Sequence, residues 1–563
     1  MFAGKKSAQI REILISESAW EEMTCLFAPS LENCFDLALE NIIRHGDTDI
    51  FPYPFESRLF EDRKEIVKTA LMQTFDDFEN KRTEVPPNMI NSFSSIGYYG
   101  YRWATQIDPF WNAFFLGLVL KIAEDIEKIR STNTSVYSYR FNPNLAAGSL
   151  FDKDISWRKY QEDSIVECAK DEIKYVLTCD IADFYPRIYH HRLENALDRI
   201  DPNKKYSGKI KKLLQTFSET KSYGVPVGCP SSRILAELAL DSIDKLLSMN
   251  RVNYKRYVDD FIIFCNSRED AHKTLTLLSK KLMENEGLTL QKHKTNIVTK
   301  EEFLSVTKAK LHGNDEDEES PMKAKFMSLP IRFDPYSANA IEEYEEIKES
   351  LKDFDLLAML SSELQKSKIN QSFSKHLIKA FSATSDEIIS STFKVMFNNL
   401  HELYPIFTTI IQVANSNWQR LSLETKGIIL EKINTLIQEN SYILSTELNL
   451  AYVARMLSKE NTEESTLILC EIYNKNPESI LVKNIVTQSM AKINSYAWLS
   501  DIKKNFAGMH PLQRRLLIVS SYFLGDEGKH WREHNKKSFN FIENIYKDWA
   551  GQRQTARNLE DAL

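Results

Sequence analysis

Several features that would place this chain in a simple class of protein are missing from its sequence. The seven cysteines are scattered and none forms a Cys-x-x-Cys pair, which argues against structural zinc and against a disulfide framework. The first residues contain no apolar segment of a signal peptide, and the longest apolar run, residues 110–120, is too short to span a bilayer. We therefore expect a cytoplasmic protein with no membrane partner, in which residues 110–130 form a partly buried helix.

An excess of basic residues is missing as well. The formal net charge is −7, so the chain as a whole is not a basic nucleic-acid coat. An acidic protein can still carry a local basic channel, and residues 209–212 and 292–294 are locally basic. The acidic run at 315–319 is most simply a solvated loop.

Glycine is scarce in the C-terminal part, where Gly427 is the only glycine between Gly313 and Gly508. Apolar residues recur there at helical spacing, and helices are expected to begin near residues 426, 444, 461, 479, 495 and 510. Taken in pairs, these helices repeat about every 34 residues, a period typical of helix–turn–helix solenoids. No sequence signature repeats, so an irregular helical bundle is the alternative.

The texture of the sequence predicts four regions. Residues 1–130 look mostly helical, with turn-rich stretches near 51–54 and 86–100. Residues 131–310 mix short β-type runs at 174–179, 254–257 and 261–265 with helical patterns at 232–247 and 268–286, which indicates an α+β domain. Residues 311–337 are expected to be an acidic loop and linker, and residues 338–563 an all-α domain.

Two carboxylate patterns carry candidate chemistry. Asp180 ends a β-type run, where a rigid backbone can hold a carboxylate at a cleft, although a strand-end aspartate can also be a turn or cap residue. Asp259 and Asp260 lie between two apolar runs, and adjacent carboxylates repel each other unless they are solvated or bind cations. A tight hairpin would present both to a metal, whereas a straight strand would point them to opposite faces. The alternative is an ordinary Asp-Asp turn.

A third pattern is the glycine- and proline-rich segment at 223–230, which leads into a helix that Ser231 or Ser232 can cap. Gly224 and Gly228 let a backbone approach a ligand closely, so Gly228 is a candidate substrate-binding residue. The alternative is a plain entry of a loop into a helix.

In this order and spacing, the segments resemble the palm domain of the reverse transcriptase family. Motif A is matched at 180–185, motif B at 224–235, motif C at 257–260 and, more weakly, motif D at 288–298. The resemblance covers about residues 135–300. It implies a right-hand fingers and palm fold of class α+β, with residues 1–130 as the helical N-terminal part of the fingers.

The resemblance also implies roles for particular positions. Asp180, Asp259 and Asp260 would hold two Mg²⁺ ions, with Mn²⁺ as a substitute in vitro, and the backbone of Ile181 would touch the same metals and the triphosphate. These metals activate the attacking 3′ oxygen and neutralise the departing pyrophosphate.

Three further side chains receive roles from the same resemblance. Tyr185 is at the steric-gate position that rejects the ribose 2′-OH, which implies deoxynucleotide substrates; the alternative is a core tyrosine. Arg140 could clamp the triphosphate, or be a structural arginine. Lys294 could protonate pyrophosphate, with Lys292 and His293 as competitors.

One departure from the usual motif B sequence narrows the resemblance to a subgroup of the family. Most reverse transcriptases have Pro-Gln-Gly in motif B, whereas this chain has Pro-Val-Gly at 226–228, and Val227 cannot hydrogen-bond near a template nucleotide. This feature and the stretches 137–141, 180–191, 224–237 and 256–260 are similar to bacterial abortive-infection and defence-associated reverse transcriptases, whose abortive-infection branch carries a HEAT-like helical region. Residues 338–563 fit that plan by texture.

The closer resemblance implies a bacterial DNA polymerase that acts in defence against bacteriophage. Two modes remain open: untemplated synthesis primed by a tyrosine of the protein, with single-stranded DNA attached to it, and templated synthesis on a bound non-coding RNA. Some members of the branch assemble as homo-oligomers, so the resemblance implies a homo-oligomer here. A rival from another class is a non-catalytic scaffold whose helical array binds partners.

Overall fold

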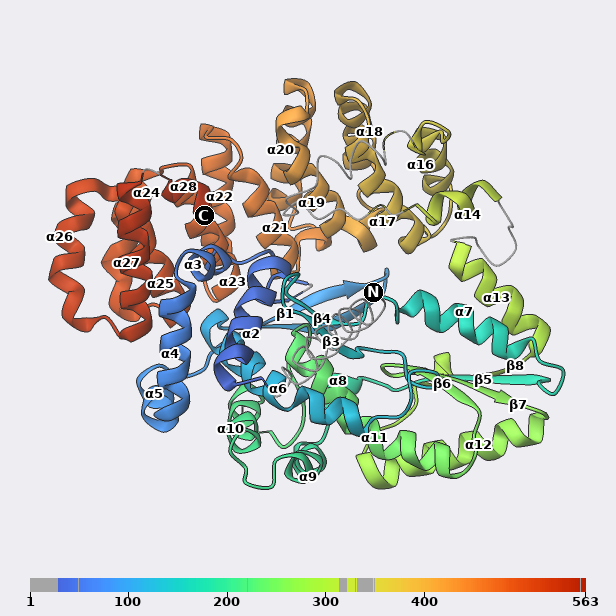
Figure 1. Cartoon of the computed structure of the whole chain (residues 1–563). Helices are drawn as coiled ribbons and strands as arrows, with labels where there is room; N and C mark the ends of the chain where they lie inside the picture. Colours follow the sequence, from blue (N-terminus) through green and yellow to red (C-terminus); the bar gives the residue numbers. More distant parts are fainter. Residues whose placement is uncertain are drawn as a thin grey trace, which may run out of the picture.

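The computed structural model describes residues 29–48, 50–219, 221–312, 321–329, 331, 348, 350–556 and 558–563. An α/β body forms one part of the molecule, and an array of helices arches over it (Figure 1). The acidic run at 315–319 lies outside the described residues.

A four-stranded antiparallel sheet forms the centre of the α/β body. Its strand order is β6-β7-β5-β8, with bounds Tyr254–Tyr257, Asp260–Cys265, Tyr175–Asp180 and Asn296–Thr299. The three strands expected from the sequence are confirmed, because their β-branched and aromatic residues suit a sheet that is buried on both faces. Helix α12 (Arg268–Lys281) packs on one face, and helices α7 (Trp157–Cys168) and α13 (Lys300–His312) pack on the other (Figure 1).

The remaining elements of this region surround the sheet. They are β3 (Phe141–Asn144), β4 (Ser149–Phe151), α8 (Phe184–Arg187), α9 (His190–Ile200), α10 (Ser207–Phe217) and α11 (Pro230–Met249). The helices expected at 232–247 and 268–286 are confirmed, the second as α12 followed by a π-helical turn at Leu282–Glu286.

The N-terminal part packs around helix α6 (Pro109–Ile129), whose residues 110–120 are all buried. Among the described residues, four shorter helices precede it: α2 (Leu31–His45), α3 (Glu56–Asp62), α4 (Lys64–Asp76) and α5 (Phe78–Glu84). Helix α6 therefore belongs to a protein core, as predicted, and more completely than expected. Within the described residues, no helix has the length and unbroken apolar character that crossing a membrane requires.

The prediction of a turn-rich stretch at residues 86–100 is wrong. It contains strand β1 (Met89–Ile96), which pairs with β2 (Gly100–Ile107) in a long antiparallel hairpin. Serines occupy several positions of β1 and hide its period-2 pattern, while the pairing with β2 supplies the hydrogen bonds that a local pattern cannot reveal. Only the tip, near Gly97, is a turn.

The C-terminal array consists of two rows of helices. In the inner row each helix packs on the next one, in the order α17 (Gln371–Ala380), α19 (Phe407–Asn417), α21 (Glu447–Leu457), α23 (Ile480–Lys492), α25 (Pro511–Ser520) and α27 (Phe541–Thr555). The outer row contains α16 (Leu356–Leu364), α18 (Asp386–Asn398), α20 (Leu423–Gln438), α22 (Glu463–Lys475), α24 (Tyr496–Ile502) and α26 (Gly525–Asn535), and α28 (Leu559–Ala562) follows the inner row.

The six helix starts expected between 426 and 510 agree with the observed starts of α20 to α25 within three residues. Alternate packing of this kind is what a solenoid requires. The assignment to HEAT-like repeats stays a prediction.

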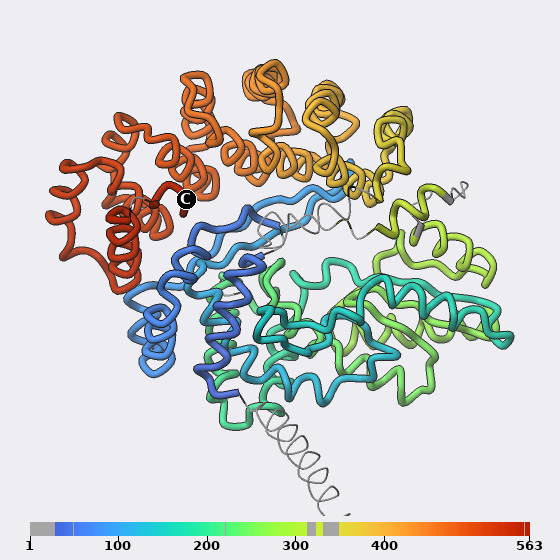
Figure 2. Tube along the Cα trace, turned by 45° about the horizontal axis from the view of Figure 1, so that its top comes forward, coloured from blue at the N-terminus to red at the C-terminus, as the bar shows by residue number. Residues whose placement is uncertain are grey.

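The inner row lies against the N-terminal part, so the array curves around it (Figure 2). The Tyr452 hydroxyl donates to the carbonyl of Ile50 at 2.9 Å, and Trp549 Nε1 donates to Asp62 Oδ2 at 2.6 Å. Arg515 and Asp108 form a buried ion pair of 2.7 Å across the same junction. These contacts join segments that are hundreds of residues apart in sequence.

The prediction that residues 311–337 are only an acidic loop and linker is partly wrong. It contains helix α14 (Pro321–Met327), and the fully buried Phe326 packs edge-on against Phe354 and Phe373. The apolar residues of this short segment were outweighed in the sequence by its charged neighbours.

Candidate active site

The sheet brings the three predicted aspartates to one edge. Asp180 is the last residue of β5, Asp260 is the first residue of β7, and the two are direct cross-strand partners. The amide of Ile181 donates to the carbonyl of Asp259 at 3.1 Å, which holds Asp259 beside the end of β5. Residues 79 positions apart in sequence therefore share one site.

The connection between β6 and β7 is the tight hairpin that presentation of both carboxylates requires. Only Val258 and Asp259 separate the two strands, and Val258 has a positive φ of 57°. A β-branched residue in this conformation is strained. The Ser138 hydroxyl accepts the Val258 amide at 2.9 Å, and Arg256 donates to the Val258 carbonyl at 2.7 Å. Both backbone polar groups of the strained residue are thus held from outside the turn.

The site concentrates negative charge in a partly buried place. Burial, with the charges of Asp260 and Asp180, raises the pKa of Asp259 to about 7. Burial and Asp180, which shares a hydrogen bond with it, raise the pKa of Asp260 to about 6. Neighbouring carboxylates thus make ionisation of Asp259 and Asp260 costlier.

Lys294 supplies one positive charge at this edge. Its Nζ lies 2.6 Å from Asp180 Oδ2. Burial lowers the pKa of Lys294, but the ion pair with Asp180 outweighs burial and raises it. Lys294 therefore lies at the carboxylates, and its role toward pyrophosphate stays a prediction. Lys292 and His293 lie in the same short helical turn, and His293 lines the adjoining cavity.

The donor set fits divalent metal ions, because clustered carboxylates are the ligands that such hard cations prefer. Within the described part of the chain, no three acidic, histidine or cysteine side chains are already drawn together as a complete metal shell. The Lys294 ammonium instead binds one of the carboxylate oxygens that a metal would take. A cation bound here would relieve the repulsion that raises the pKa values of Asp259 and Asp260.

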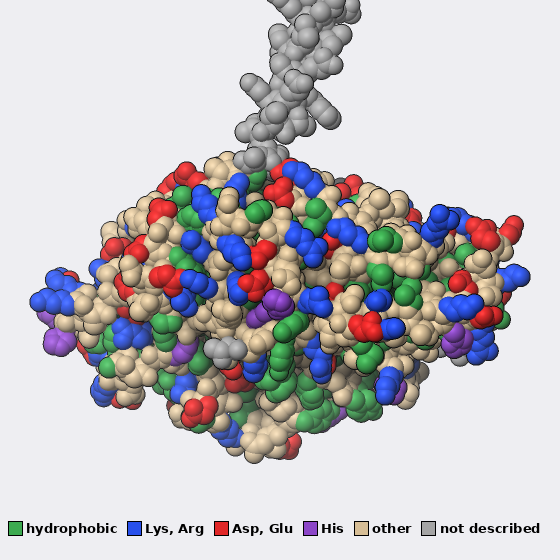
Figure 3. All heavy atoms as spheres, turned by 90° about the horizontal axis from the view of Figure 1, so that it is seen from below, with side chains coloured by type: hydrophobic (Ala, Val, Ile, Leu, Met, Phe, Trp, Pro, Cys, Tyr) green, Lys and Arg blue, Asp and Glu red, His purple; other side chains and the backbone are tan. Residues whose placement is uncertain are grey.

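A cavity of about 550 Å³ adjoins the carboxylates. Its wall includes Asp260, Lys294, Lys310, Trp157 and His293. The volume is within the range of sites for small molecules, and its basic groups suit a phosphate-bearing ligand. On the face that Figure 3 shows, by contrast, basic and acidic side chains are interspersed.

The motif B loop is tied directly to motif A. The amide of Val225 donates to the carbonyl of Tyr185 at 3.0 Å, and the amide of Gly224 donates to Ile188 at 2.8 Å. Gly224 and Gly228 have φ values of 100° and 117°, which explains glycine at both positions. Gly228 thus lies in the predicted loop, and its role toward substrate stays a prediction.

Tyr185 is half-buried beside this loop. Burial raises the pKa of its hydroxyl well above the ordinary value, with Tyr139, Arg233 and Glu237 as charged or polar neighbours. A neutral, rigidly packed ring is what a steric gate needs. The steric-gate role stays a prediction.

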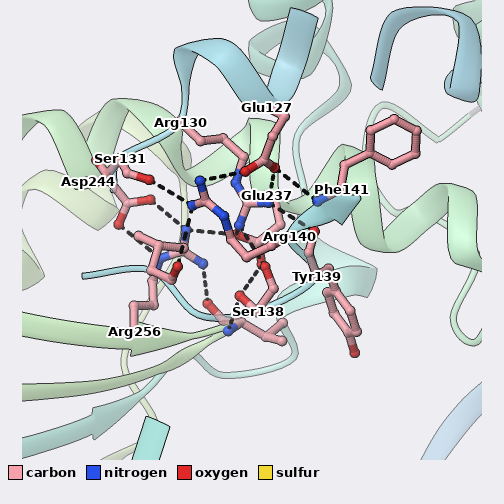
Figure 4. A network of polar contacts seen from close by, with 12 residues as sticks. Glu127, Arg130, Ser131, Ser138, Tyr139, Arg140, Phe141, Glu237, Asp244 and Arg256 are labelled. Atoms are coloured by element: carbon pink, nitrogen blue, oxygen red, sulfur yellow. Dashed lines mark hydrogen bonds and ion pairs between the residues drawn. The ribbon is translucent and has the colours of Figure 1, made fainter. Parts of the chain in front are cut away.

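Arg140 is committed to protein partners. It forms an ion pair of 2.5 Å with Glu127 and donates to the carbonyl of Ser131 at 2.7 Å (Figure 4). A triphosphate clamp requires a guanidinium whose donors face the ligand. The structure therefore favours the structural alternative for Arg140.

A buried ionic network beside Arg140 was not anticipated from the sequence (Figure 4). Glu237 of α11 accepts from Arg130 at 2.7 Å and from Arg256 at 2.9 Å, and it accepts the Ser138 hydroxyl. Arg256 also binds Asp244 at 2.5 Å. Glu237 and Arg256 are charged residues within the motif-bearing stretches 224–237 and 256–260, which was the available signal, whereas Ser138 offered none.

Comparison with known proteins agrees with this geometry. The family model described as "Reverse transcriptase (RNA-dependent DNA polymerase)" matches residues 122–324. The retron Ec73 reverse transcriptase of Escherichia coli is 28% identical over 130 residues, which cover 21% of this chain and 41% of that protein. The chain thus spans less than half the length of this curated relative.

Two solved telomerase structures superpose only loosely. The telomerase of Candida albicans in complex with a fragment of telomeric RNA has a TM-score of 0.30 at 11% identity, covering 76% of this chain and 68% of that one. The apo telomerase of Candida tropicalis has a TM-score of 0.27 at 10% identity, covering 74% of each chain. The assignment depends on the sequence matches and the site instead.

The sequence matches support the predicted resemblance to the bacterial defence-associated reverse transcriptases. Reverse transcriptases in general use divalent metal ions and bind nucleic acid, in accord with the acidic site and the adjoining basic cavity. Residues 122–324 are therefore similar to the reverse transcriptase family over a segment that includes Asp180, Asp259 and Asp260.

Proposed function

We propose that this protein is a Mg²⁺-dependent DNA polymerase that acts in bacterial defence against phage and extends DNA without a template from one of its own tyrosines. The observation that carries the catalytic part is the convergence of Asp180, Asp259 and Asp260 at one sheet edge beside Lys294. Val227 in motif B and the helical array support the untemplated and defence-related parts. We further propose a cytoplasmic homo-oligomer.

The residues of the site have distinct roles in this proposal. Asp180, Asp259, Asp260 and the backbone of Ile181 would hold the metals, which when bound lower the pKa of the attacking hydroxyl and offset charge on the phosphates. Lys294, whose Nζ lies 2.6 Å from Asp180 Oδ2, would donate its proton to the leaving pyrophosphate. Tyr185 excludes a 2′-OH by its bulk, so deoxynucleoside triphosphates are the substrates.

Incubation of the purified protein with each dNTP and Mg²⁺, without template or primer, tests this proposal. We expect DNA that stays attached to the protein through phenol extraction, and mass spectrometry would then locate the modified tyrosine. Products that form only with an added template and primer would refute untemplated synthesis.

The match to a retron reverse transcriptase favours a second candidate, a templated enzyme that copies a bound non-coding RNA. Sequencing of the nucleic acid that copurifies with the protein distinguishes the two. A defined RNA with its complementary DNA would support the templated enzyme, whereas random or homopolymeric DNA would support the first proposal.

The double variant Asp259→Ala/Asp260→Ala separates both enzymes from a non-catalytic scaffold. Loss of phage protection at unchanged protein abundance is expected, because the metal ligands are removed from a surface-accessible edge. Full protection by this variant would show that catalysis is dispensable.

A further inference from the structure

The β1–β2 hairpin presents exposed aromatic rings on one face. Phe93 and Trp103 are cross-strand partners whose rings stack at 4.2 Å, and they are 47% and 49% exposed. Tyr101, two residues before Trp103 on the same face, packs edge-on against Phe93 at 6.1 Å. Large aromatic side chains left in solvent together, rather than singly, indicate a binding surface.

The opposite face of the same hairpin is buried, so the exposure is one-sided. Ser92 and Ala104, which are cross-strand partners on that face, are 2% and 0% exposed, and α21 of the array lies against β1. Among the described residues, the hairpin is therefore seated on one face, and its aromatic face is the more exposed of the two.

This aromatic face begins beside the motif B loop and ends at the array. The amide of Thr105, two residues beyond Trp103, donates to the carbonyl of Val227 in the motif B loop at 3.0 Å. At the other end, the hydroxyls of Ser95 and Tyr101 lie 2.9 Å and 3.0 Å from the hydroxyl of Tyr404. Alternate residues of a strand are about 6.7 Å apart, so the rings form a ladder that leads away from the loop.

Positive charge gathers around the far half of the hairpin. Lys368 lies 5.3 Å from the centre of the Tyr99 ring, and Tyr99 is 85% exposed. Arg102 is exposed between Tyr101 and Trp103 but starts from the opposite face of β2, where it lies near Lys375 and Lys379 of α17. Burial, together with the charges of Arg102 and Lys379, lowers the pKa of Lys375. Among the described residues, none of Arg102, Lys375 and Lys379 forms an ion pair with an acid; Glu402 is the nearby acidic residue, and its backbone carbonyl binds Tyr98.

We propose that this aromatic face is a stacking platform for the bases of single-stranded DNA, with Lys368 at the Tyr99 ring and the exposed Arg102 at the hairpin edge holding its phosphates. Base–aromatic stacking beside a basic groove is how proteins bind single strands without reading their sequence. The proposal rests on the DNA polymerase activity proposed above, since it routes the product from the motif B loop toward the array.

The charges favour DNA over a protein occupant. An apolar protein partner would be opposed by the unpaired cations, whereas phosphates are attracted to them. DNA rather than RNA follows from the deoxynucleotide substrates proposed above.

The test measures binding of fluorescein-labelled oligo(dT) to the full-length protein by anisotropy, without dNTPs. Trp103→Leu and Phe93→Leu keep an apolar side chain but remove the flat ring. Each is expected to weaken binding roughly 5- to 150-fold at unchanged melting temperature, since each removes a stacking surface. Tyr496→Leu, at a 51% exposed tyrosine of α24, is the matched control and should bind like wild type.

Two further measurements keep the test decisive. Arg102→Gln should reduce the slope of log affinity against log salt by about 1. A 5-iododeoxyuridine oligonucleotide should photo-crosslink to peptides within residues 89–107. Wild-type affinity for oligo(dT) in both leucine variants would overturn the platform. It would also be overturned if the protein bound oligo(rU) more tightly than oligo(dT) and Trp103→Leu weakened only the binding of oligo(rU).

The remaining outcomes separate the platform from the activity. In one outcome, sedimentation detects that Trp103→Leu breaks an oligomer while DNA binding stays unchanged. That result would make this face an interface between copies and refute the platform. Weakened DNA binding in the variants without any dNTP incorporation by wild type would refute the polymerase proposal alone. Incorporation by wild type with unaltered binding in the variants would refute the platform alone.

Discussion

Replacing Ser138 by alanine should damage the catalytic turn from outside it. The buried Ser138 hydroxyl accepts the amide of Val258 and donates to Glu237, so one small side chain joins the strained turn to the ionic network. The left-handed Val258 costs on the order of 1–2 kcal/mol, and the network must hold it in place.

The size of the effect follows from the groups left unpaired. Ser138→Ala leaves a buried amide without its acceptor and removes a hydrogen bond to a charged carboxylate, each worth about 1–3 kcal/mol. Because the two losses share one cavity they will not add fully, and we expect about 2–4 kcal/mol less stability. A turn displaced by about 1 Å lowers kcat by roughly 10²-fold.

The assay compares steady-state dNTP incorporation and thermal unfolding with a matched control, Ser92→Ala. Ser92 is also buried, but its hydroxyl has no hydrogen-bond partner in the described part of the chain. Its removal should leave both measurements near wild type. Wild-type kcat in Ser138→Ala, or an equal loss in Ser92→Ala, would refute the reasoning.

Three further predictions concern groups elsewhere in the fold. Burial raises the pKa of Glu56 to about 8, so the folded state favours the neutral carboxyl group, and the stability of the fold should decrease as pH rises from about 5 to 8. Glu56→Gln should flatten this decrease, measured as melting temperature against pH. A pH profile unchanged by the substitution would contradict the role of Glu56. Arg515→Ala leaves Asp108 buried and uncompensated, and should lower the free energy of unfolding in denaturant by about 3–5 kcal/mol. The double variant with Asp108→Asn should lose less stability than Arg515→Ala alone. An equal or larger loss in the double variant would contradict the pairing of the two residues. Lys294→Ala should lower kcat about 10²-fold with little change in KM for dNTP, while Lys294→Arg retains more activity; a loss confined to KM would make Lys294 a binding residue instead.

Local patterns explain which predictions from the sequence were right. The strands that carry Asp180 and Asp260 have runs of β-branched and aromatic residues, and the array helices keep a regular apolar spacing with little glycine. Such patterns reflect burial of one face or both, so a single strand or helix can be read without knowing its neighbours. The β1 strand was missed because its serines have no such pattern and its pairing partner defines it.

The sequence by itself determined the order and spacing of the carboxylates, and with them the expectation of a two-metal polymerase of the reverse transcriptase type. Tertiary structure alone decided which charged groups meet: Lys294 with Asp180, Arg140 with Glu127, and Arg256 with Glu237 and Asp244. It also placed the aromatic hairpin between the motif B loop and the array. The physical reason is the distance in sequence over which each interaction acts. Backbone propensity acts within a few residues, whereas ion pairs and packing join residues that only the folded chain brings together.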